Sequence, residues 1–231
     1  MPAAARPTGN RLRPRRSTPR EARFGLSFDL RRHWENVYSQ KSPEEMSWYE
    51  PHLATSVDWI RDAASDSSAS IIDVGGGAST LVDDLYVEGF RSLTVLDVSA
   101  NALARSQNQL GARADSIRWI TGDVIHCSLP LASFDIWHDR AVFHFLTDQA
   151  ERDAYVHRVK STLKPAGQII LATFSTRGPR SCSGLPVSRY DAASIQEQFG
   201  PEFQLTKSVT TIHHTPAGGS QESLYCRLAL S

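Results

Sequence analysis

Short apolar runs alternate with amphipathic segments along the chain from residue 70 onward. Buried strands of a parallel sheet are near-continuous apolar runs, whereas surface helices repeat their apolar residues every three or four positions. On these criteria the chain predicts helices over 81–88, 100–110, 148–163 and 191–199, and strands over 70–74, 92–96, 117–121, 134–138 and 168–174. This alternation predicts an α/β, Rossmann-like fold, with a mostly parallel sheet and helices on both faces.

The two ends of this region differ from its middle. Two strand-like runs over 203–214 and 221–230 are joined by the turn-forming segment Pro-Ala-Gly-Gly at 216–219. This pattern predicts an antiparallel hairpin at the edge of the sheet. Residues 26–65 are helical in character and rich in aromatic side chains. We therefore predict a single domain over 26–231 that begins with an aromatic helical cap.

Charge is segregated along the chain, although its total is balanced. The 231 residues include 25 basic and 25 acidic side chains, and 40% are hydrophobic. This composition is typical of a globular protein and argues against a dedicated nucleic-acid binder, which usually carries a basic excess. Residues 1–32 hold nine arginines and two acids, a charge of +7, so residues 33–231 carry −7 from 16 basic and 23 acidic side chains.

The arginine-rich start of the chain predicts a disordered basic tail over residues 1–25. This stretch is rich in Pro and Ala, and its first aromatic residue is Phe24, so it cannot bury enough apolar surface to offset its conformational entropy. An organelle-targeting segment and an arm that contacts polyanions are the two alternatives. Prolines at positions 7, 14 and 19 would interrupt a targeting helix and weaken the first of them.

The cysteines and the hydropathy of the chain predict its compartment. Cys127, Cys182 and Cys226 form an odd, sparse set without Cys-x-x-Cys spacing, which favours free thiols in a reducing cytoplasm and predicts no metal site. No run of 18 or more apolar residues and no apolar signal core is visible. We expect a cytoplasmic protein with no membrane contact.

A glycine turn followed by a distant acid gives the sharpest chemical signal. Gly75, Gly76 and Gly77 lie between a predicted strand and a predicted helix, where glycine allows a ligand to approach the backbone closely. Asp97 ends the next strand, 22 residues beyond Gly75. An acid at that place can accept hydrogen bonds from both ribose hydroxyls of an adenosine cofactor.

The residues around the glycines distinguish between nucleotide cofactors. A dinucleotide fingerprint requires a third glycine where this chain has Thr80. Asp73, just before the glycines, would repel a phosphate but suits a cationic ligand. S-adenosylmethionine (SAM) carries an ammonium and a sulfonium and has no phosphate, so the electrostatics favour SAM over NAD.

The succession of motifs resembles the class I SAM-dependent methyltransferases over about residues 45–230. The glycine turn and Asp97 are followed by Thr121-Gly122-Asp123-Val124, by 133–140 (SFDIWHDR) and by 163–170 (LKPAGQII). The resemblance implies a seven-stranded sheet with an antiparallel last strand. It also implies that Asp73 and Gly75 flank the methionine part of SAM, that Asp97 binds the ribose and that Asp123 binds the adenine. Many members have a second glycine where this chain has Ala166.

This resemblance defines the expected cofactor site. The candidate residues for SAM binding are Asp73, Gly75, Gly76, Gly77, Asp97, Val98, Asp123, Val124 and Trp48.

The cap narrows the resemblance to two groups within the superfamily. Residues 33–38 (HWENVY) and 46–49 (MSWY) resemble the caps of thiopurine-type small-molecule methyltransferases and of methyltransferase-like protein-lysine enzymes. Core packing of large aromatic side chains is an alternative explanation of the same residues. The candidate substrate contacts are Trp34, Tyr38 and Tyr49 in the cap, and Cys182 and Arg189 in the loop after the fifth strand.

Candidate catalytic residues follow the fourth strand. Methyl transfer needs alignment and exclusion of water, and a general base only for some acceptors. His138, Asp139 and His144 are the candidates, although each histidine has a structural alternative and Asp139 could form an ion pair with Arg140.

Three hypotheses for function remain open at this stage. The first is a SAM-dependent methyltransferase with a small-molecule acceptor. The second keeps the fold and methylates a protein lysine, and the charge of −7 on the body would suit a basic protein surface. The third, from another class, is a non-catalytic module that binds polyanions through its basic tail. We expect no specific nucleic-acid partner.

Overall fold

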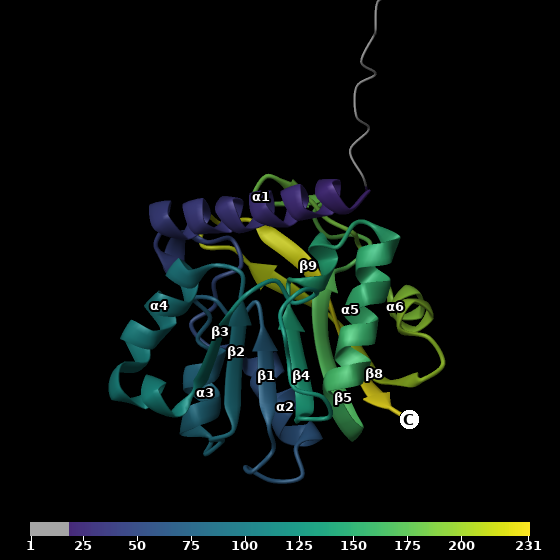
Figure 1. The fold of residues 1–231 in the computed structure, drawn as a ribbon. Coiled ribbons are helices and arrows are strands. Elements are labelled where there is room, and N and C mark those ends of the chain that lie inside the picture. The colour runs from purple at the N-terminus through teal and green to yellow at the C-terminus, as the bar shows by residue number, and fades with distance from the viewer. Residues whose placement is uncertain (1–18) are drawn as a thin grey trace, which may run out of the picture.

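A seven-stranded sheet in the order β3-β2-β1-β4-β5-β9-β8 organises the chain (Figure 1). The computed structural model describes residues 19–231, with side chains described from Leu30 onward. Neighbouring strands from β3 to β5 are parallel, whereas β9 is antiparallel to both β5 and β8. This arrangement confirms the predicted fold class. The strands are β1 (Ile71–Val74), β2 (Leu93–Asp97), β3 (Arg118–Thr121), β4 (Phe134–Arg140), β5 (Leu163–Phe174), β8 (Phe203–His214) and β9 (Ser220–Leu230).

Helices cover both faces of the sheet because its strands are apolar on both sides. Successive residues of a strand point to opposite faces, so Ile71 and Ile72 of β1 belong to two different hydrophobic clusters. The cluster of Ile71 includes apolar residues of α2 (Ala54–Ala63), α3 (Leu81–Val87) and α4 (Ala100–Leu110). The cluster of Ile72 includes those of α5 (Gln149–Thr162) and α6 (Ala192–Phe199).

The long helix α1 (Pro19–Gln40) crosses the edge of the sheet where the parallel strands end (Figure 1). Glu35 of α1 holds it against the start of α4. Its carboxylate accepts hydrogen bonds from the Ala100 N–H (2.7 Å), the Asn101 N–H (3.2 Å) and the Ser99 hydroxyl (3.1 Å). A carboxylate at a helix N-terminus satisfies free N–H groups and complements the helix dipole. The helix is therefore fixed over the end of the sheet.

Most boundaries agree with the sequence prediction within two residues, but β5 begins at Leu163, five residues before the predicted start at 168. Three further differences matter. Strand β4 continues to Arg140, past the predicted end at 138. The loop after β5 contains a short hairpin, β6 (Ser181–Cys182) and β7 (Leu185–Pro186), that was not predicted. Of the predicted tail, residues 1–18 lie outside the described residues, and 19–25 form part of α1.

Three short 3₁₀ helices complete the described chain: η1 (Pro43–Glu45), η2 (Gly111–Ser116) and η3 (Phe143–Phe145). In the turn at the start of β5, Ala166 has a φ of 60°. This positive φ favours glycine, and here alanine adopts it.

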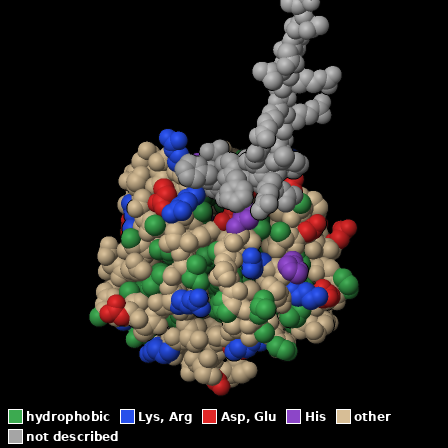
Figure 2. Space-filling view, in the orientation of Figure 1, with side chains coloured by type: hydrophobic (Ala, Val, Ile, Leu, Met, Phe, Trp, Pro, Cys, Tyr) green, Lys and Arg blue, Asp and Glu red, His purple; other side chains and the backbone are tan. Residues whose placement is uncertain are grey.

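Charged side chains of both signs are interspersed on the face shown in Figure 2, with no single basic patch among the described residues of that face. The described part of the chain, from residue 19, contains no helix with the length and hydrophobicity needed to span a bilayer. In that same part, no group of His, Cys, Asp or Glu side chains is arranged to hold a metal ion.

The Glu35 contact generates a prediction about stability. Glu35→Ala would leave the α4 N–H groups without their acceptor and should lower the free energy of unfolding by about 1–2 kcal/mol. Urea denaturation followed by circular dichroism measures this change. Glu44→Ala, which removes an exposed acid of η1, is the matched control and should change the stability by less than about 0.5 kcal/mol. Equal effects of the two substitutions would contradict the role of Glu35.

Candidate active site

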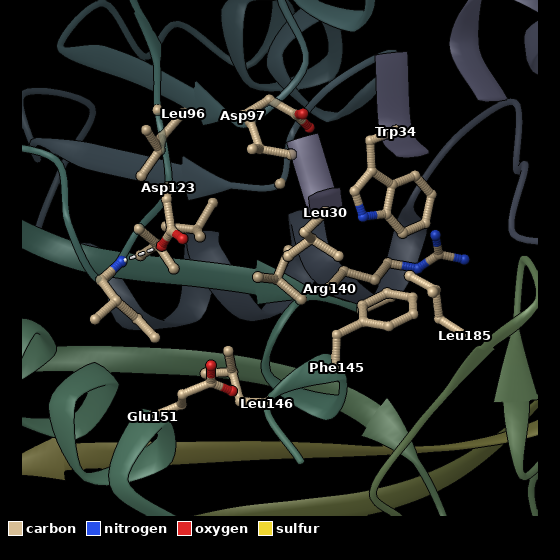
Figure 3. A pocket seen from close by; sticks show the side chains of 18 of the residues that line it. Leu30, Trp34, Leu96, Asp97, Asp123, Arg140, Phe145, Leu146, Glu151 and Leu185 are labelled. Atoms are coloured by element: carbon tan, nitrogen blue, oxygen red, sulfur yellow. Dashed lines mark hydrogen bonds between the residues drawn. The ribbon is translucent and has the colours of Figure 1, made fainter. Parts of the chain in front are cut away.

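A cavity of about 410 Å³ lies between the carboxyl ends of the strands and α1. Its floor comes from β1, β2 and β4 and from the loop after β3, and its cover comes from α1 and the β6–β7 hairpin. Figure 3 shows Asp123 at one end and Trp34, Arg140 and Phe145 facing one another at the other end. The volume is within the range of about 300–1,000 Å³ that is typical of small-ligand sites.

The glycine turn after β1 brings backbone close to the cavity and leaves no room for side chains. A Cβ atom at Gly75, where φ is +71°, would lie 2.0 Å from Cγ2 of Val142. At Gly76 it would lie 2.5 Å from Oδ2 of Asp73. Gly75 and Gly76 line the cavity, whereas Gly77 does not. The carbonyl of Gly77 instead accepts a hydrogen bond from the Ser106 hydroxyl, 2.5 Å away.

Two buried carboxylates, Asp73 and Asp97, stand at the ends of the adjoining strands β1 and β2, with 4% and 6% of their surface exposed. Oδ1 of Asp73 lies 2.7 Å from Nδ1 of His138, and Oδ2 has no hydrogen-bond partner among the described residues. Asp97 accepts the Ser99 N–H at 2.8 Å. Burial, aided by the negative charges of Asp73 and Glu35 and opposed by backbone hydrogen bonds, raises the pKa of Asp97 to about 7.

The third acid, Asp123, lies in the loop after β3. Its carboxylate accepts the Ile125 N–H at 2.8 Å and lies 3.2 Å from Nδ1 of His126. Val98, Asp123 and Val124 line the same cavity as Asp73 and Asp97. The strand ends therefore present three acids to one cavity, an environment that suits a cationic ligand with hydroxyl groups.

Aromatic side chains close the other end of the cavity. Trp34 of α1 packs edge to face against Phe145 and Trp48, with ring centroids 5.2 and 5.8 Å away. Arg140, at the end of β4, donates to the Trp48 carbonyl at 2.9 Å and to Glu50 at 2.6 Å. Its guanidinium is thus held in a fixed orientation at the cavity wall (Figure 3).

Three of the five predicted substrate contacts line the cavity, and two do not. Trp34, Tyr38 and Cys182 line the cavity. Tyr49 packs in the aromatic cluster of the cap and Arg189 donates to the carbonyls of Thr176 and Gly178, so neither faces the cavity. Burial raises the pKa of the Cys182 thiol and raises that of Tyr38 far above its usual range, so both stay protonated at neutral pH.

Two of the three predicted catalytic residues lie outside the cavity lining. Asp139 is fully buried on the opposite face of β4 and accepts the Val142 and Phe143 N–H groups and the Tyr155 hydroxyl, at 2.9, 3.1 and 2.5 Å. His144 stacks on Phe174, and burial lowers its pKa to about 3, so its ring is neutral. We therefore assign both a structural role. His138 does line the cavity.

The comparisons with known proteins agree with this geometry. A family model described as a methyltransferase domain matches residues 71–167, which include β1, the glycine turn, Asp97 and Asp123. Residues 71–167 thus form a methyltransferase domain, and the match confirms the resemblance to the class I SAM-dependent methyltransferases that the motif order predicted.

Two proteins with similar sequences are named as eEF1A methyltransferases. EEF1A lysine methyltransferase 2 of Danio rerio is 25% identical over 171 residues, 71% of this chain and 67% of that protein. The bovine eEF1A lysine and N-terminal methyltransferase is 22% identical over 189 residues, and the match spans only 27% of its length.

A solved structure shares the fold at greater coverage. The 1,6-didemethyltoxoflavin-N1-methyltransferase of Burkholderia thailandensis, solved with that compound and S-adenosylhomocysteine, has a TM-score of 0.64 and 17% identity. It covers 97% of this chain, and the chain covers 94% of it. At this identity the likeness shows a common fold.

Several cavity residues of the methyltransferase were not predicted from the sequence. They include Leu30, Ser79, Arg140, Phe145, Glu151 and Leu185. Arg140 carried a usable signal, because residues two apart on a strand share a face and His138 was already a candidate. Leu30 and Leu185 reach the cavity only through the packing of α1 and the β6–β7 hairpin, which no local pattern indicates.

The surroundings of Asp139 predict a loss of stability on substitution. Asp139→Asn would remove the charge that strengthens three hydrogen bonds and should lower the free energy of unfolding by about 1–3 kcal/mol. Urea denaturation tests this, with Asp115→Asn at an exposed position as the control. An unchanged stability with a large loss of activity would instead favour a catalytic role for Asp139.

The raised pKa of Asp97 predicts how cofactor affinity depends on pH. Below pH 7 a growing fraction of free protein carries a proton on Asp97, and the neutral acid is a poorer acceptor for two hydroxyl groups. S-adenosylhomocysteine should therefore bind about tenfold more weakly at pH 6 than at pH 8. Isothermal titration calorimetry measures this, and Asp97→Asn should weaken binding and flatten its pH dependence. A variant that keeps the wild-type pH profile would show that another group titrates.

Proposed function

We propose that this methyltransferase binds SAM along Asp73, Asp97 and Asp123 and transfers its methyl group to a small-molecule acceptor. The supporting observation is the cover over the cavity: Leu30 and Trp34 of α1 and Leu185 of the β6–β7 hairpin all line it. An enclosed aromatic end suits a compact acceptor that can be surrounded and separated from water.

The residues of the cavity fit the cofactor on structural grounds. The unpartnered Oδ2 of buried Asp73 is costly until a donor reaches it, and the ammonium group of SAM is such a donor. Gly75 and Gly76 line the cavity with backbone alone, since a Cβ at either position would clash with Val142 or Asp73. We expect Asp97 to accept hydrogen bonds from the ribose hydroxyls and Asp123 to accept one from the adenine amino group, because both line the cavity together with Val98 and Val124. Bound SAM supplies an electrophilic methyl group on a sulfonium that is already a good leaving group.

The chain contributes alignment and exclusion of water to the reaction. Trp34 and Phe145, held edge to face, form a wall against which a flat acceptor can be oriented. Tyr38 and Cys182 are protonated, so they act as hydrogen-bond donors and not as bases. These residues favour an acceptor that brings its own lone pair, such as a neutral nitrogen or sulfur.

A protein-lysine acceptor is the second candidate. It is favoured by the relatives named as EEF1A lysine methyltransferases and by the net charge of −7 on residues 33–231, which would attract a basic surface. The covered aromatic end of the cavity argues for the small molecule, since a lysine on a folded protein needs a channel through that cover.

Labelled SAM separates the two candidates. The protein is incubated with methyl-labelled SAM and a cell extract, which is then divided by ultrafiltration into macromolecules and small molecules. We expect label in the small-molecule fraction, as a product distinct from SAM, and none with Asp97→Ala. Label in protein bands, lost with the same variant, would instead establish the protein-lysine enzyme.

The aromatic wall gives a further prediction. Trp34→Ala should remove much of the acceptor contact while leaving the acids of the cofactor end in place, so KM for the acceptor should rise about tenfold or more. The affinity for S-adenosylhomocysteine should change less than threefold. Trp119→Ala, at a residue on the outer strand β3 that does not line the cavity, is the control. A large loss of cofactor affinity in Trp34→Ala would assign this residue to the cofactor instead.

A further inference from the structure

A chain of four buried polar side chains leads from β9, under α2, to the cavity. Asp73 and His138 are register partners on the parallel strands β1 and β4, so their side chains share a face. Nδ1 of His138 lies 2.7 Å from Oδ1 of Asp73, and Nε2 lies 2.9 Å from the Ser56 hydroxyl. The Tyr225 hydroxyl lies 3.4 Å beyond, next to Ser56.

These side chains are shielded from water, so their hydrogen bonds must come from one another. Their exposed fractions are 4% for Asp73, 1% for His138, 0% for Ser56 and 5% for Tyr225. They come from four elements: β1, β4, α2 and β9. Buried polar groups of this kind destabilise the fold unless each has a hydrogen-bond partner. Here the donors and acceptors can be paired in one order along the chain of side chains.

The direction follows from the chemistry of the groups. A carboxylate only accepts, so Nδ1 of His138 carries a proton and donates to Asp73. With a neutral ring, Nε2 accepts from the Ser56 hydroxyl, whose oxygen is then free to accept from Tyr225. Asp73 thus fixes the tautomer of His138, Ser56 engages the second ring nitrogen, and the ring of His138 in turn holds the carboxylate of Asp73.

Ser56, His138 and Asp73 are linked in the order of a Ser-His-Asp triad. Here, however, the aspartate and not the serine lines the cavity. Ser56 is fully buried and does not line the cavity, so it cannot act as a nucleophile. Asp73 does line the cavity. With Oδ1 bound by His138, the acceptor that remains for a ligand is Oδ2, the atom without a partner among the described residues.

We propose that His138 is a positioning residue for cofactor binding. It holds Asp73 by Oδ1 so that Oδ2 receives the ammonium group of the SAM amino-acid part, and Ser56 fixes the orientation of the His138 ring by its bond to Nε2. The proposal rests on the proposed binding of SAM in this cavity. It replaces general acid–base catalysis by His138, because both ring nitrogens are already engaged.

Two probes that differ only in the recognised group test this proposal. S-adenosylhomocysteine carries the amino-acid part, and 5′-methylthioadenosine lacks it. Isothermal titration should show that His138→Leu binds S-adenosylhomocysteine about 10- to 100-fold more weakly, the value of a charge-assisted hydrogen bond. Its affinity for 5′-methylthioadenosine should change less than about threefold. His138→Asn, which keeps a donor near Nδ1, should recover most of the loss.

Matched variants separate positioning from structure. Ser56→Ala should also weaken the binding of S-adenosylhomocysteine and spare that of 5′-methylthioadenosine, but by a smaller factor. If His138→Leu does not fold, Ser56→Ala and His138→Asn together provide the test. His144→Phe alters another buried histidine, one outside the cavity, and should leave both affinities unchanged. Equal losses for the two probes, or an unchanged affinity for S-adenosylhomocysteine, would overturn the proposal.

The test also distinguishes this proposal from the proposed function. If the wild-type protein binds neither probe, the proposed SAM site is wrong and the role of His138 falls with it. If the wild type binds S-adenosylhomocysteine well and the variants show no selective loss, only the positioning role is wrong.

Discussion

The burial of two carboxylates at adjoining strand ends is the constraint around which the site is built. Asp73 and Asp97 are almost completely buried, and the charge of Asp73 contributes to the raised pKa of Asp97. Like charges in a poorly solvated space destabilise the folded state unless hydrogen bonds or a cation offset them. The chain supplies some of these hydrogen bonds, from His138 to Asp73 and from the Ser99 N–H to Asp97. A cationic ligand would supply the rest, so the same feature that costs stability favours SAM.

The cover of the cavity is connected to these acids through one residue. The Ser99 N–H binds Asp97, and the Ser99 hydroxyl donates to Glu35 of α1. Because that hydroxyl also accepts the Ala102 N–H, a single serine joins β2, the start of α4 and the covering helix. The position of α1 is therefore linked to that of Asp97.

The sequence predicted the parts of this protein whose signals are local. Asp73, Asp97 and Asp123 could be found because each lies at or just beyond the end of a short strand, and parallel strands end at one edge. Asp139 was misplaced because β4 extends to Arg140, so its alternation sends Asp139 to the opposite face from His138. The contacts of Glu35, and the cavity lining by Leu30 and Leu185, depend on how distant segments pack. Such contacts leave no periodic pattern in the sequence.

The central claim is that the acids of the cavity select a cationic adenosine cofactor over one that carries phosphate. Isothermal titration of the full chain with SAM and, separately, with NAD tests it directly, since both ligands contain adenosine. The account predicts that SAM binds at least about 100-fold more tightly, because Asp73 attracts the ammonium and repels the pyrophosphate. Equal affinities, or tighter binding of NAD, would contradict it.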